Sequence, residues 1–465
     1  MLVPLWTDIL IFLLVGAVAA FAFHARRREH LRAPWRRVGS SAVAMVSLVV
    51  LGIYVLVGLL DSVHYRPSLP PASEGAPTEY STEVLSVFDA MVAHLRHMEE
   101  KTYSAPFATH LFVKETVELP DGGTERAYPR LVHGGSHLQD PERDRIPDIA
   151  ATAVGAVIVA LVAWCAVCAA FIALWARRNR RPFGAAAGEI LRGATMVRWR
   201  PVQVSIGACA TLICVVLALS FDYHVLGTDK VGEDVLYQTL KSVRTGLVIG
   251  TLTTLVMLPF ALLLGIMAGY FRGIVDDLIQ YLYTTLNSIP SVLLIASAIL
   301  LLQVYLDGHA EDYTSVVERA DLRLLFLCLI LGVTSWTGLC RYLRAESLKL
   351  REVDYVQAAT ALGATHFAIL RRHILPNVMH IVLITVVLDF SGLVLAEAVL
   401  SYVQIGVDPT MHSWGNMINS ARLEMAREPV VWWSLSAAFL FMFTLVLAAN
   451  LFSDTVRDAL DPRLR

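Results

Sequence analysis

The most informative stretch of this chain is Asp354-Tyr355-Val356-Gln357-Ala358-Ala359-Thr360-Ala361-Leu362-Gly363, which is followed by Arg371-Arg372-His373-Ile374-Leu375-Pro376-Asn377. Its small residues favour a short helix, its glycine can end that helix with a positive φ, and its proline fits the first turn of a new apolar span. Tyr355, Val356, Ala359 and Leu362 form one apolar stripe on that helix. The stretch predicts a helix outside the membrane that a soluble protein can bind. On spacing alone, an interfacial helix whose Arg371 and Arg372 face lipid phosphates is an equal alternative.

The composition predicts an all-α polytopic membrane protein. Of 465 residues, 56% are hydrophobic and 17% are charged, whereas soluble chains carry about a quarter charged residues. Apolar runs of about 20 residues recur, which is long enough to cross a bilayer as helices. Nine candidate spans lie at about 7–23, 41–60, 150–175, 203–221, 243–270, 278–303, 323–340, 378–402 and 431–453. The first could instead be a signal peptide, but its arginines follow the apolar run rather than precede it.

The basic loops predict the orientation. Residues 24–37 hold six arginines against Glu29 alone, and residues 176–200 hold seven arginines against Glu189 alone. The segment between them, about 61–149, carries eight Lys or Arg and fifteen Asp or Glu. The positive-inside rule places both basic loops in the cytoplasm and the acidic segment outside. Alternating from there, the N-terminus is outside and the C-terminus is cytoplasmic, and the 354–377 stretch falls in the cytoplasm.

These features divide the chain into N-terminal spans (1–61), an external segment (62–149), an extra span with a basic loop (150–200) and a C-terminal core (201–465) that contains the loop 345–376. The external segment opens with the Pro-rich stretch 66–71 and contains no cysteine, so no disulfide holds it. Helical spacing of apolar residues over 84–98 predicts one amphipathic helix of about 20 residues that packs on another surface. His94 and His97 could share a face of it, but without carboxylate or cysteine partners we expect no metal site.

Further segments of the second half carry recognisable patterns in a fixed order over about 240 residues. They are Leu226–Leu236 (with Gly227, Thr228, Asp229 and Asp234), Gly269–Gly273 with Asp276, Ser288–Ser291, Leu400–Met417 (with Ser413, Trp414 and Gly415) and Asp458–Arg465. Together with 354–377, this set resembles the C-type permease subunit of dipeptide, oligopeptide and nickel ABC importers. The resemblance does not cover the first 200 residues.

The resemblance implies a six-span importer core with about three additional N-terminal spans. It makes the 354–377 stretch the loop that couples to the ATPase, through Tyr355, Gln357, Ala358, Ala359, Leu362, Gly363, Arg371 and Pro376. It assigns contact with a binding protein, or an external gate, to Gly227, Thr228, Asp229, Asp234, Ser413, Trp414 and Gly415. Two positions depart from the family pattern: Gln357 stands where a glutamate is usual, and His373 where an isoleucine is usual. Either 41–60 or 203–221 could be the family's first span; if it is the former, residues 62–222 are an insertion.

The implied partners are a homologous second permease, two ABC ATPase subunits, a periplasmic or lipid-anchored binding protein and membrane lipid, with no nucleic acid. The implied location is the cytoplasmic membrane of a bacterium. The chain contains no G-x-x-x-x-G-K-[ST] loop and no placed catalytic constellation, so we expect no catalytic residue and no cofactor here, with ATP and Mg²⁺ on the partner ATPases. Short peptides are the expected cargo; nickel or another small solute is the alternative. A secondary transporter and a membrane-anchored sensor or assembly protein are alternatives of another class.

We single out three of the ionisable residues that lie inside predicted spans. Asp389 and Glu397 are eight residues apart in one span, so they point to similar faces. Such residues are costly in hydrocarbon and are functional candidates, although an interhelical hydrogen bond or a wet position near the interface is the more frequent explanation. Arg244 lies near the outer end of its span, and we expect it to snorkel to the surface.

Overall fold

The computed structural model describes residues 1–26, 29–69, 79–118, 124–193, 195, 197–309 and 315–460. Arg27 and Arg28 of the first basic loop, Pro70 and Pro71 of the Pro-rich stretch, and residues 461–465 of the C-terminal pattern lie outside this range. Within it, nine segments are helical, long and apolar enough to cross a membrane. They comprise α1 (Trp6–Arg26), α3 (Ala42–Asp61), α6 (Pro141–Arg178), α8 (Trp199–Leu219), α9 (Val235–Phe271), α11 (Ser291–Gly308), α12 (Val316–Ser335) with α13 (Thr337–Arg351), α15 (His366–Ile369) with the π-helical turn η2 (Leu370–Ile374) and α16 (Leu375–Tyr402), and α18 (Trp433–Leu460).

The remaining elements are short. The helices are α2 (Glu29–Ser40), α4 (Val87–Met91), α5 (Ala93–His97), α7 (Phe183–Arg192), α10 (Ile274–Ser288), α14 (Asp354–Ala361) and α17 (Trp414–Glu424). Two antiparallel hairpins lie in the segment 62–149: β1 (His64–Tyr65) pairs with β2 (Leu85–Ser86), and β3 (Glu115–Glu118) pairs with β4 (Thr124–Ala127). The membrane-spanning part is thus helical, as the composition predicts, and strands occur only as these short pairs within the described residues.

The helix α9 is the centre of the core. Asp234 caps its first turn by accepting from the backbone N–H groups of Leu236 and Tyr237. The other helices α13, α12, α16, α3 and α10 all pack on α9. The contact with α13 is close because Gly265 and Gly269 face its backbone: a Cβ on Gly269 would lie 2.5 Å from the Arg344 carbonyl oxygen. At about 1.5 Å per residue, this helix of 37 residues spans about 55 Å.

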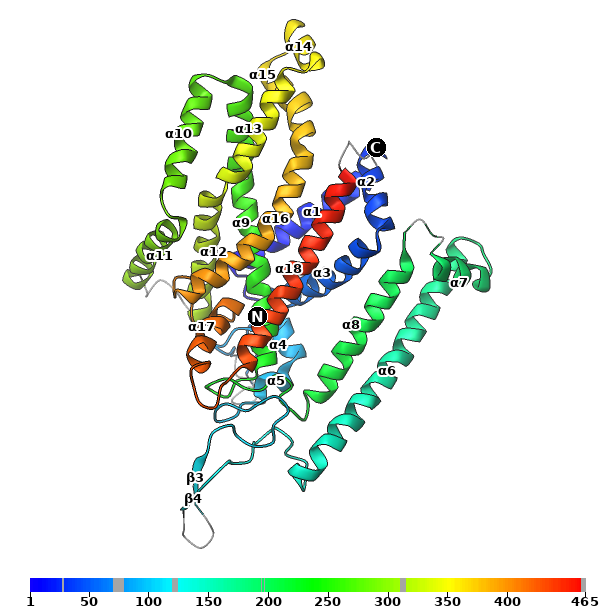
Figure 1. Cartoon of the computed structure of the whole chain (residues 1–465), viewed down its shortest axis with the longest axis vertical. Helices are drawn as coiled ribbons and strands as arrows, with labels where there is room; N and C mark the ends of the chain where they lie inside the picture. Colours follow the sequence, from blue (N-terminus) through cyan, green and yellow to red (C-terminus); the bar gives the residue numbers. More distant parts are fainter. Residues whose placement is uncertain are drawn as a thin grey trace.

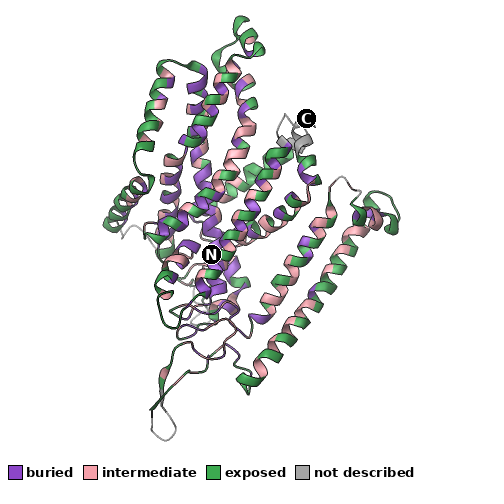
Figure 2. Ribbon diagram, viewed as in Figure 1, coloured by how far each residue is buried: buried purple, intermediate pink, exposed green. Residues whose placement is uncertain are grey.

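Two N-terminal helices belong to the core, and two later ones stand apart from it. The helix α3 packs on α18 and α9, and α1 packs on α12 and α9. By contrast α6 and α8 form a hairpin joined by α7. The hairpin packs on α3 and, near Leu219, on the segment 62–149. In Figure 1 this hairpin stands beside the bundle, and in Figure 2 most of its surface is exposed or intermediate.

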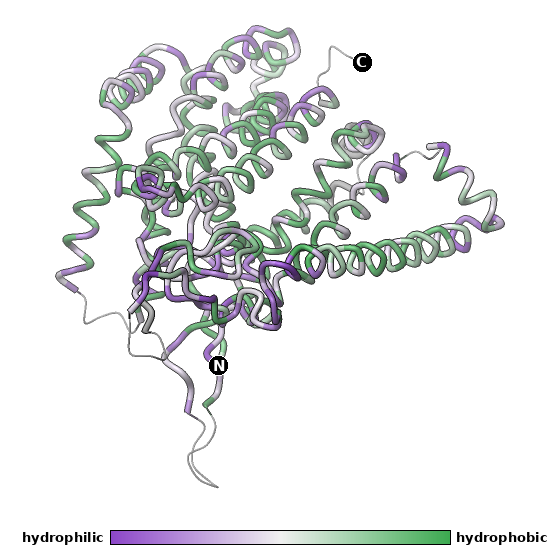
Figure 3. The backbone as a smooth tube through the Cα atoms, turned by 60° about the horizontal axis from the view of Figure 1, so that its bottom comes forward, coloured by the Kyte–Doolittle hydropathy of each residue, from purple (hydrophilic) through white to green (hydrophobic). Residues whose placement is uncertain are grey.

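The chain has two polar ends separated by the apolar helices. In Figure 1, α14 and α15 lie at the top of the molecule, and the segment 62–149, with β3 and β4, lies at the bottom. Figure 3 shows hydrophobic helices leading away from the more hydrophilic loops of that segment. The predicted coupling loop and the predicted external segment therefore occupy opposite ends of the molecule.

The prediction of one amphipathic helix over 84–98 is wrong. Ser86 and Asp89 form a reciprocal capping box that starts α4 at Val87, and Val92 (φ −109°, ψ 27°) separates α4 from α5. The packing prediction for the same residues is confirmed. Phe88, Val92 and Leu95 are buried in a cluster with Leu219, Val225, Leu236 and Tyr237.

The predicted span 278–303 is not one continuous helix. The helix α10 ends at Ser288, Ile289 is extended (φ −90°, ψ 128°), and α11 begins at Ser291. Pro290 explains the break, because a proline disfavours helical geometry in the residue before it. Only α11 is long and apolar enough to be a span by itself.

Candidate coupling loop and outer loops

The helix α14 projects from the end of the bundle and divides its apolar side chains between two surfaces. Val356 is 1% exposed and packs with Ile369, Ile374 and Val378, and Ala359 lies against the same cluster. Leu362 is 88% exposed, and Tyr355 is half-exposed. The predicted stripe is therefore split: one part fixes α14 to the bundle, and the other faces outward.

Phe367 is a second highly exposed apolar side chain, which the sequence analysis did not select. It is 72% exposed and lies in α15, after the turn that follows α14. Ala358 and Arg371 are also exposed. Exposed large apolar side chains at the tip of a projecting loop are typical of an interaction surface.

The turn after α14 depends on Gly363. Its φ is +78°, a value that a non-glycine residue rarely adopts, and a Cβ there would meet no atom within 4 Å. The Ala364 N–H donates to the Ala359 carbonyl oxygen over 3.0 Å and closes the end of the helix. Pro376 is the second residue of α16, directly after the π-helical turn. Gly363 thus ends a helix with a positive φ, and Pro376 lies in the first turn of a helix, as the sequence predicts.

The coupling loop is fixed to the end of α9. The Tyr270 hydroxyl and His366 Nδ1 are 2.8 Å apart, and Arg351 donates to the Tyr270 carbonyl oxygen over 2.9 Å. Arg272 forms an ion pair of 2.6 Å with Glu352. Hydrogen bonds, an ion pair and packing therefore join this loop to the end of α9.

Gln357 bonds within its own loop. Its Nε2 donates to the Glu352 carbonyl oxygen over 3.2 Å. The resemblance implies a glutamate at position 357, and the Glu352 carboxylate lies close to that position, 3.4 Å from Gln357 Nε2. The Tyr355 hydroxyl accepts from Asn377, which joins α14 to the start of α16.

At the opposite end, most of the predicted binding-protein contacts are buried. Gly227, Thr228 and Asp234 lie beneath the segment 62–149. The Ser104 N–H donates to the Thr228 hydroxyl over 2.7 Å, and a Cβ on Gly227 would lie 2.5 Å from the Ser104 carbonyl oxygen. These residues shape the interface between segment and core. The exposed tip of the loop is instead Lys230 and Val231, beside the partly exposed Asp229.

The loop 413–415 is buried as well. The Trp414 indole donates to the Thr239 carbonyl oxygen over 3.1 Å, and Ser413 caps α17 by accepting from the Asn416 N–H. Glu397, 2% exposed, accepts from Ser401 over 2.7 Å and also faces Ser413 and the Gly415 N–H. This carboxylate holds α16 to the loop, which agrees with the interhelical hydrogen-bond explanation.

Asp389 differs from Glu397. Its side chain is half-buried on α16, and among the residues that the structure describes it has no hydrogen-bond or ion-pair partner. A carboxylate without a partner in a span is costly, so Asp389 keeps its place as a candidate for the transport pathway.

The snorkelling prediction for Arg244 is wrong. Its side chain is 5% exposed and reaches Asp8 of α1 over 2.6 Å and Asp321 of α12 over 3.4 Å. Both partners lie far away in the sequence, which is why periodicity could not find them. The group fastens α1 and α12 to α9.

A buried charge cluster, missed by the sequence analysis, joins the segment 62–149 to the core. His224 Nδ1 lies 2.7 Å from Asp234, and its Nε2 lies 3.5 Å from Glu100. Burial alone would lower the pKa of His224, but these carboxylates outweigh it and raise the pKa to about 9. Glu100 also accepts from the N–H groups of Val132 and His133. His224 is therefore a protonated link between two parts of the chain.

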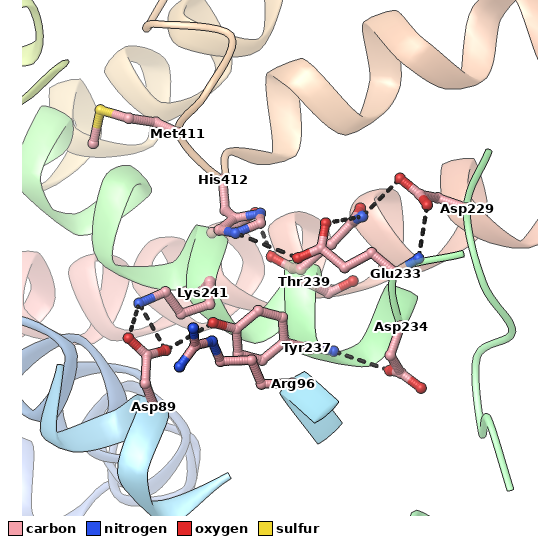
Figure 4. Close-up of polar contacts among 12 residues, drawn as sticks. Asp89, Arg96, Asp229, Glu233, Asp234, Tyr237, Thr239, Lys241, Met411 and His412 are labelled. Atoms are coloured by element: carbon pink, nitrogen blue, oxygen red, sulfur yellow. Dashed lines mark hydrogen bonds and ion pairs between the residues drawn. The ribbon is translucent and has the colours of Figure 1, made fainter. Parts of the chain in front are cut away.

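A polar cavity of about 630 Å³ lies beside this junction, between the segment 62–149, α9, α12 and the loop 410–412. Lys241 occupies one side, where Asp61 lies 2.6 Å away and Asp89, labelled in Figure 4, lies 3.0 Å away. His412 also lines it, and burial together with the charge of Lys241 lowers the pKa of His412 to about 4. At neutral pH the cavity therefore presents an uncharged imidazole next to the ion pairs of Lys241 with Asp61 and Asp89.

Glu233 and Asp229 line a neighbouring cavity of about 240 Å³. Gln238 donates to both of these carboxylates, which Figure 4 labels. Burial and the nearby Asp229 raise the pKa of Glu233 to about 7, against the opposing hydrogen bond from Gln238. The end of the molecule opposite α14 is therefore a polar surface with hollows.

Comparison with known proteins identifies the family to which the chain is related. A family model described as "binding-protein-dependent transport system inner membrane component" matches residues 261–465. The glutathione transport system permease protein GsiD of Pectobacterium atrosepticum is 32% identical over 244 residues, which are 52% of this chain and 73% of that protein. The oligopeptide transport system permease protein OppC of Haemophilus influenzae is 30% identical over 243 residues, which are 52% and 71%.

Among solved structures, a chain of the MetNI methionine ABC transporter, in an inward-facing form, covers 49% of this chain and 97% of its own length. Its TM-score is 0.35 at 16% identity, which is too weak a likeness to support a conclusion. The family rests on the permease relatives, which match in sequence and of which this chain covers more than two thirds. The chain belongs to the family of binding-protein-dependent transport system inner membrane components, the multi-pass permease subunits of ABC importers.

Proposed function

We propose that this permease imports short peptides and that α14 is the point at which the ATPase acts on it. The observation that carries the proposal is the outward apolar surface of Leu362, Phe367 and Tyr355 on a loop whose inner face is packed into the bundle. Relatives named as oligopeptide and glutathione permeases support the peptide cargo. The complete importer has a homologous second permease, two ATPase subunits that hold ATP and Mg²⁺, and a binding protein outside.

In this mechanism, closure of the ATPase pair displaces α14. The ion pair of Arg272 with Glu352 and the contact of Tyr270 with His366 carry that displacement to α9. Because α9 is one continuous helix about 55 Å long, it carries the displacement on to the outer loops. The pathway lies between the two permeases, where Asp389 is the candidate contact for the cargo.

The orientation is also part of the proposal: α14 faces the cytoplasm and the segment 62–149 faces outward. The location of α14 and this segment at opposite ends supports it. Reporter fusions at about residues 30, 190 and 350 should be cytoplasmic, and those at about 100, 230 and 415 external. A reversal within 226–465 would contradict the orientation.

The packing of α3 on α9 and α18 favours α3, rather than α8, as the first core span. Residues 62–222 would then be an insertion that adds the outer segment and the α6–α8 hairpin. Deleting 141–219 and joining the ends with a flexible linker tests this idea: an insertion predicts that the remaining core still assembles with its ATPase.

The function itself is tested by reconstituting the complex in liposomes with its binding protein. Uptake of labelled di- and tripeptides should require ATP hydrolysis. Uptake of a nickel chelate with no peptide uptake would establish the alternative cargo. Transport driven by an ion gradient, without any ATPase partner, would establish the secondary-transporter alternative.

A further inference from the structure

A third cavity, of about 780 Å³, opens between α3 and α8, away from the candidate coupling loop and the outer loops. Its walls are mainly apolar: Val46 and Val50 come from α3, and Val204 and Ala208 from α8. Both helices are candidate membrane spans, so these walls face hydrocarbon depth. The walls are therefore compatible with an acyl chain and unsuited to a polar solute.

One end of this cavity is basic. Arg192, Arg198 and Arg200 line it, and no acidic residue does. All three side chains are exposed, and within the described part of the chain their guanidinium groups have no hydrogen-bond or ion-pair partner. Three free guanidinium groups beside an apolar groove are chemically complementary to a phosphate attached to a hydrocarbon tail.

The basic end of the cavity also lies at the depth in the membrane where lipid phosphates are found. Arg198 donates from its backbone N–H to the Gly39 carbonyl oxygen over 3.0 Å, so the two arginine-rich loops meet here. Ala42 and Trp199, the first residues of α3 and α8, begin their spans next to this contact. The arginines thus lie where the spans leave the membrane, which is the level of the lipid headgroups.

We propose that this cavity holds an anionic phospholipid, with its phosphate among Arg192, Arg198 and Arg200 and its acyl chains along Val46, Val50 and α8. Such a lipid fills the space between the core helix α3 and the α6–α8 hairpin. It therefore acts as a structural bridge between the hairpin and the core.

The test uses the full-length chain, purified within its complex in detergent and analysed by native mass spectrometry. The probes are phosphatidylglycerol and phosphatidylcholine with identical acyl chains. We expect phosphatidylglycerol to be retained about 100-fold more tightly, since three arginines line the site. Each arginine near a membrane surface contributes about a fivefold preference for anionic lipid, so Arg198→Gln with Arg200→Gln should reduce this preference about 25-fold.

Two further variants separate the possible causes. Arg177→Gln with Arg178→Gln removes two exposed arginines of α6 that do not line the cavity, and it should leave the preference unchanged. Ala208→Trp fills the apolar groove without changing charge, and it should weaken retention of both lipids. Inorganic phosphate at millimolar concentration should not displace phosphatidylglycerol.

Three results would overturn the proposal. They are equal retention of the two lipids by the wild type, an equal loss of preference in the Arg177 and Arg178 control, and displacement of the lipid by inorganic phosphate alone. If the variant with Arg198→Gln and Arg200→Gln lost the ATPase subunit from the complex but retained the lipid as the wild type does, the arginines would be assigned to a protein partner instead.

Discussion

Truncating Leu362 to alanine should weaken binding of the ATPase subunit to this permease without disturbing the packing of the membrane-spanning helices. Leu362 is 88% exposed, so nearly its whole side chain is available for burial against a partner. Full burial of a leucine side chain stabilises a contact by about 1.5–3 kcal/mol. Alanine keeps only one methyl group, so the loss should be about 2 kcal/mol, or about 30-fold in the dissociation constant.

The assay measures binding of the purified ATPase to the permease pair in nanodiscs, together with peptide-stimulated ATP hydrolysis. Leu301→Ala is the matched control, because Leu301 is also a highly exposed leucine (73%) but lies on the spanning helix α11. We expect weaker binding and lower stimulation for Leu362→Ala alone. Unchanged binding and stimulation, or an equal effect in both variants, would refute the assignment of α14.

The remaining predictions concern the turn, the buried histidine and the outer segment. Gly363→Leu should leave the protein in the membrane, because a Cβ there has open space, but abolish transport, because φ +78° costs about 1–2 kcal/mol for a side chain; full uptake would argue against it. The raised pKa of His224 contributes stability that is fully present below about pH 6.5 and is lost as the pH rises through about 9. The melting temperature should therefore fall between pH 7 and 10, and it should fall less in His224→Gln. Parallel curves of melting temperature against pH for the two proteins would exclude this role. Phe88→Asp with Leu95→Asp should release the segment 62–149 from the core and weaken assembly by several kcal/mol, while the spans still insert. The released segment should become sensitive to protease, whereas Met91→Asp, at an exposed position of the same region, should not have this effect. Equal protease sensitivity of the two variants would contradict the packing role.

The spans could be predicted because a bilayer permits few solutions. A run of about 20 apolar residues must satisfy its backbone internally, and composition alone reveals such runs. The ends were less predictable, since polar residues can continue a helix beyond its apolar part. The predicted span 243–270 corresponds to α9, which begins at Val235 because Asp234 caps it there.

The structure of the candidate coupling loop could be predicted to the extent that its properties are local. The positive φ of Gly363 follows from a glycine at the end of a short helix. The burial of Val356 does not, because Val356 packs with Ile374 and Val378 and with residues of α9 and α13. Arg244 and His224 could not be understood in this way, because their partners come from distant parts of the chain. For the same reason, the sequence marked Thr228 and Trp414 as important without revealing that both are covered.

The most direct test of the account is a photo-crosslink from α14. A benzoylphenylalanine placed at position 367, where Phe367 is 72% exposed, replaces one aromatic side chain by another and should leave the fold intact. On illumination of the assembled complex in native membranes, the account predicts a crosslink to the ATPase subunit, identified by mass spectrometry, and none from the same probe at position 301. A crosslink from position 367 to lipid alone, with the ATPase present and active, would contradict it.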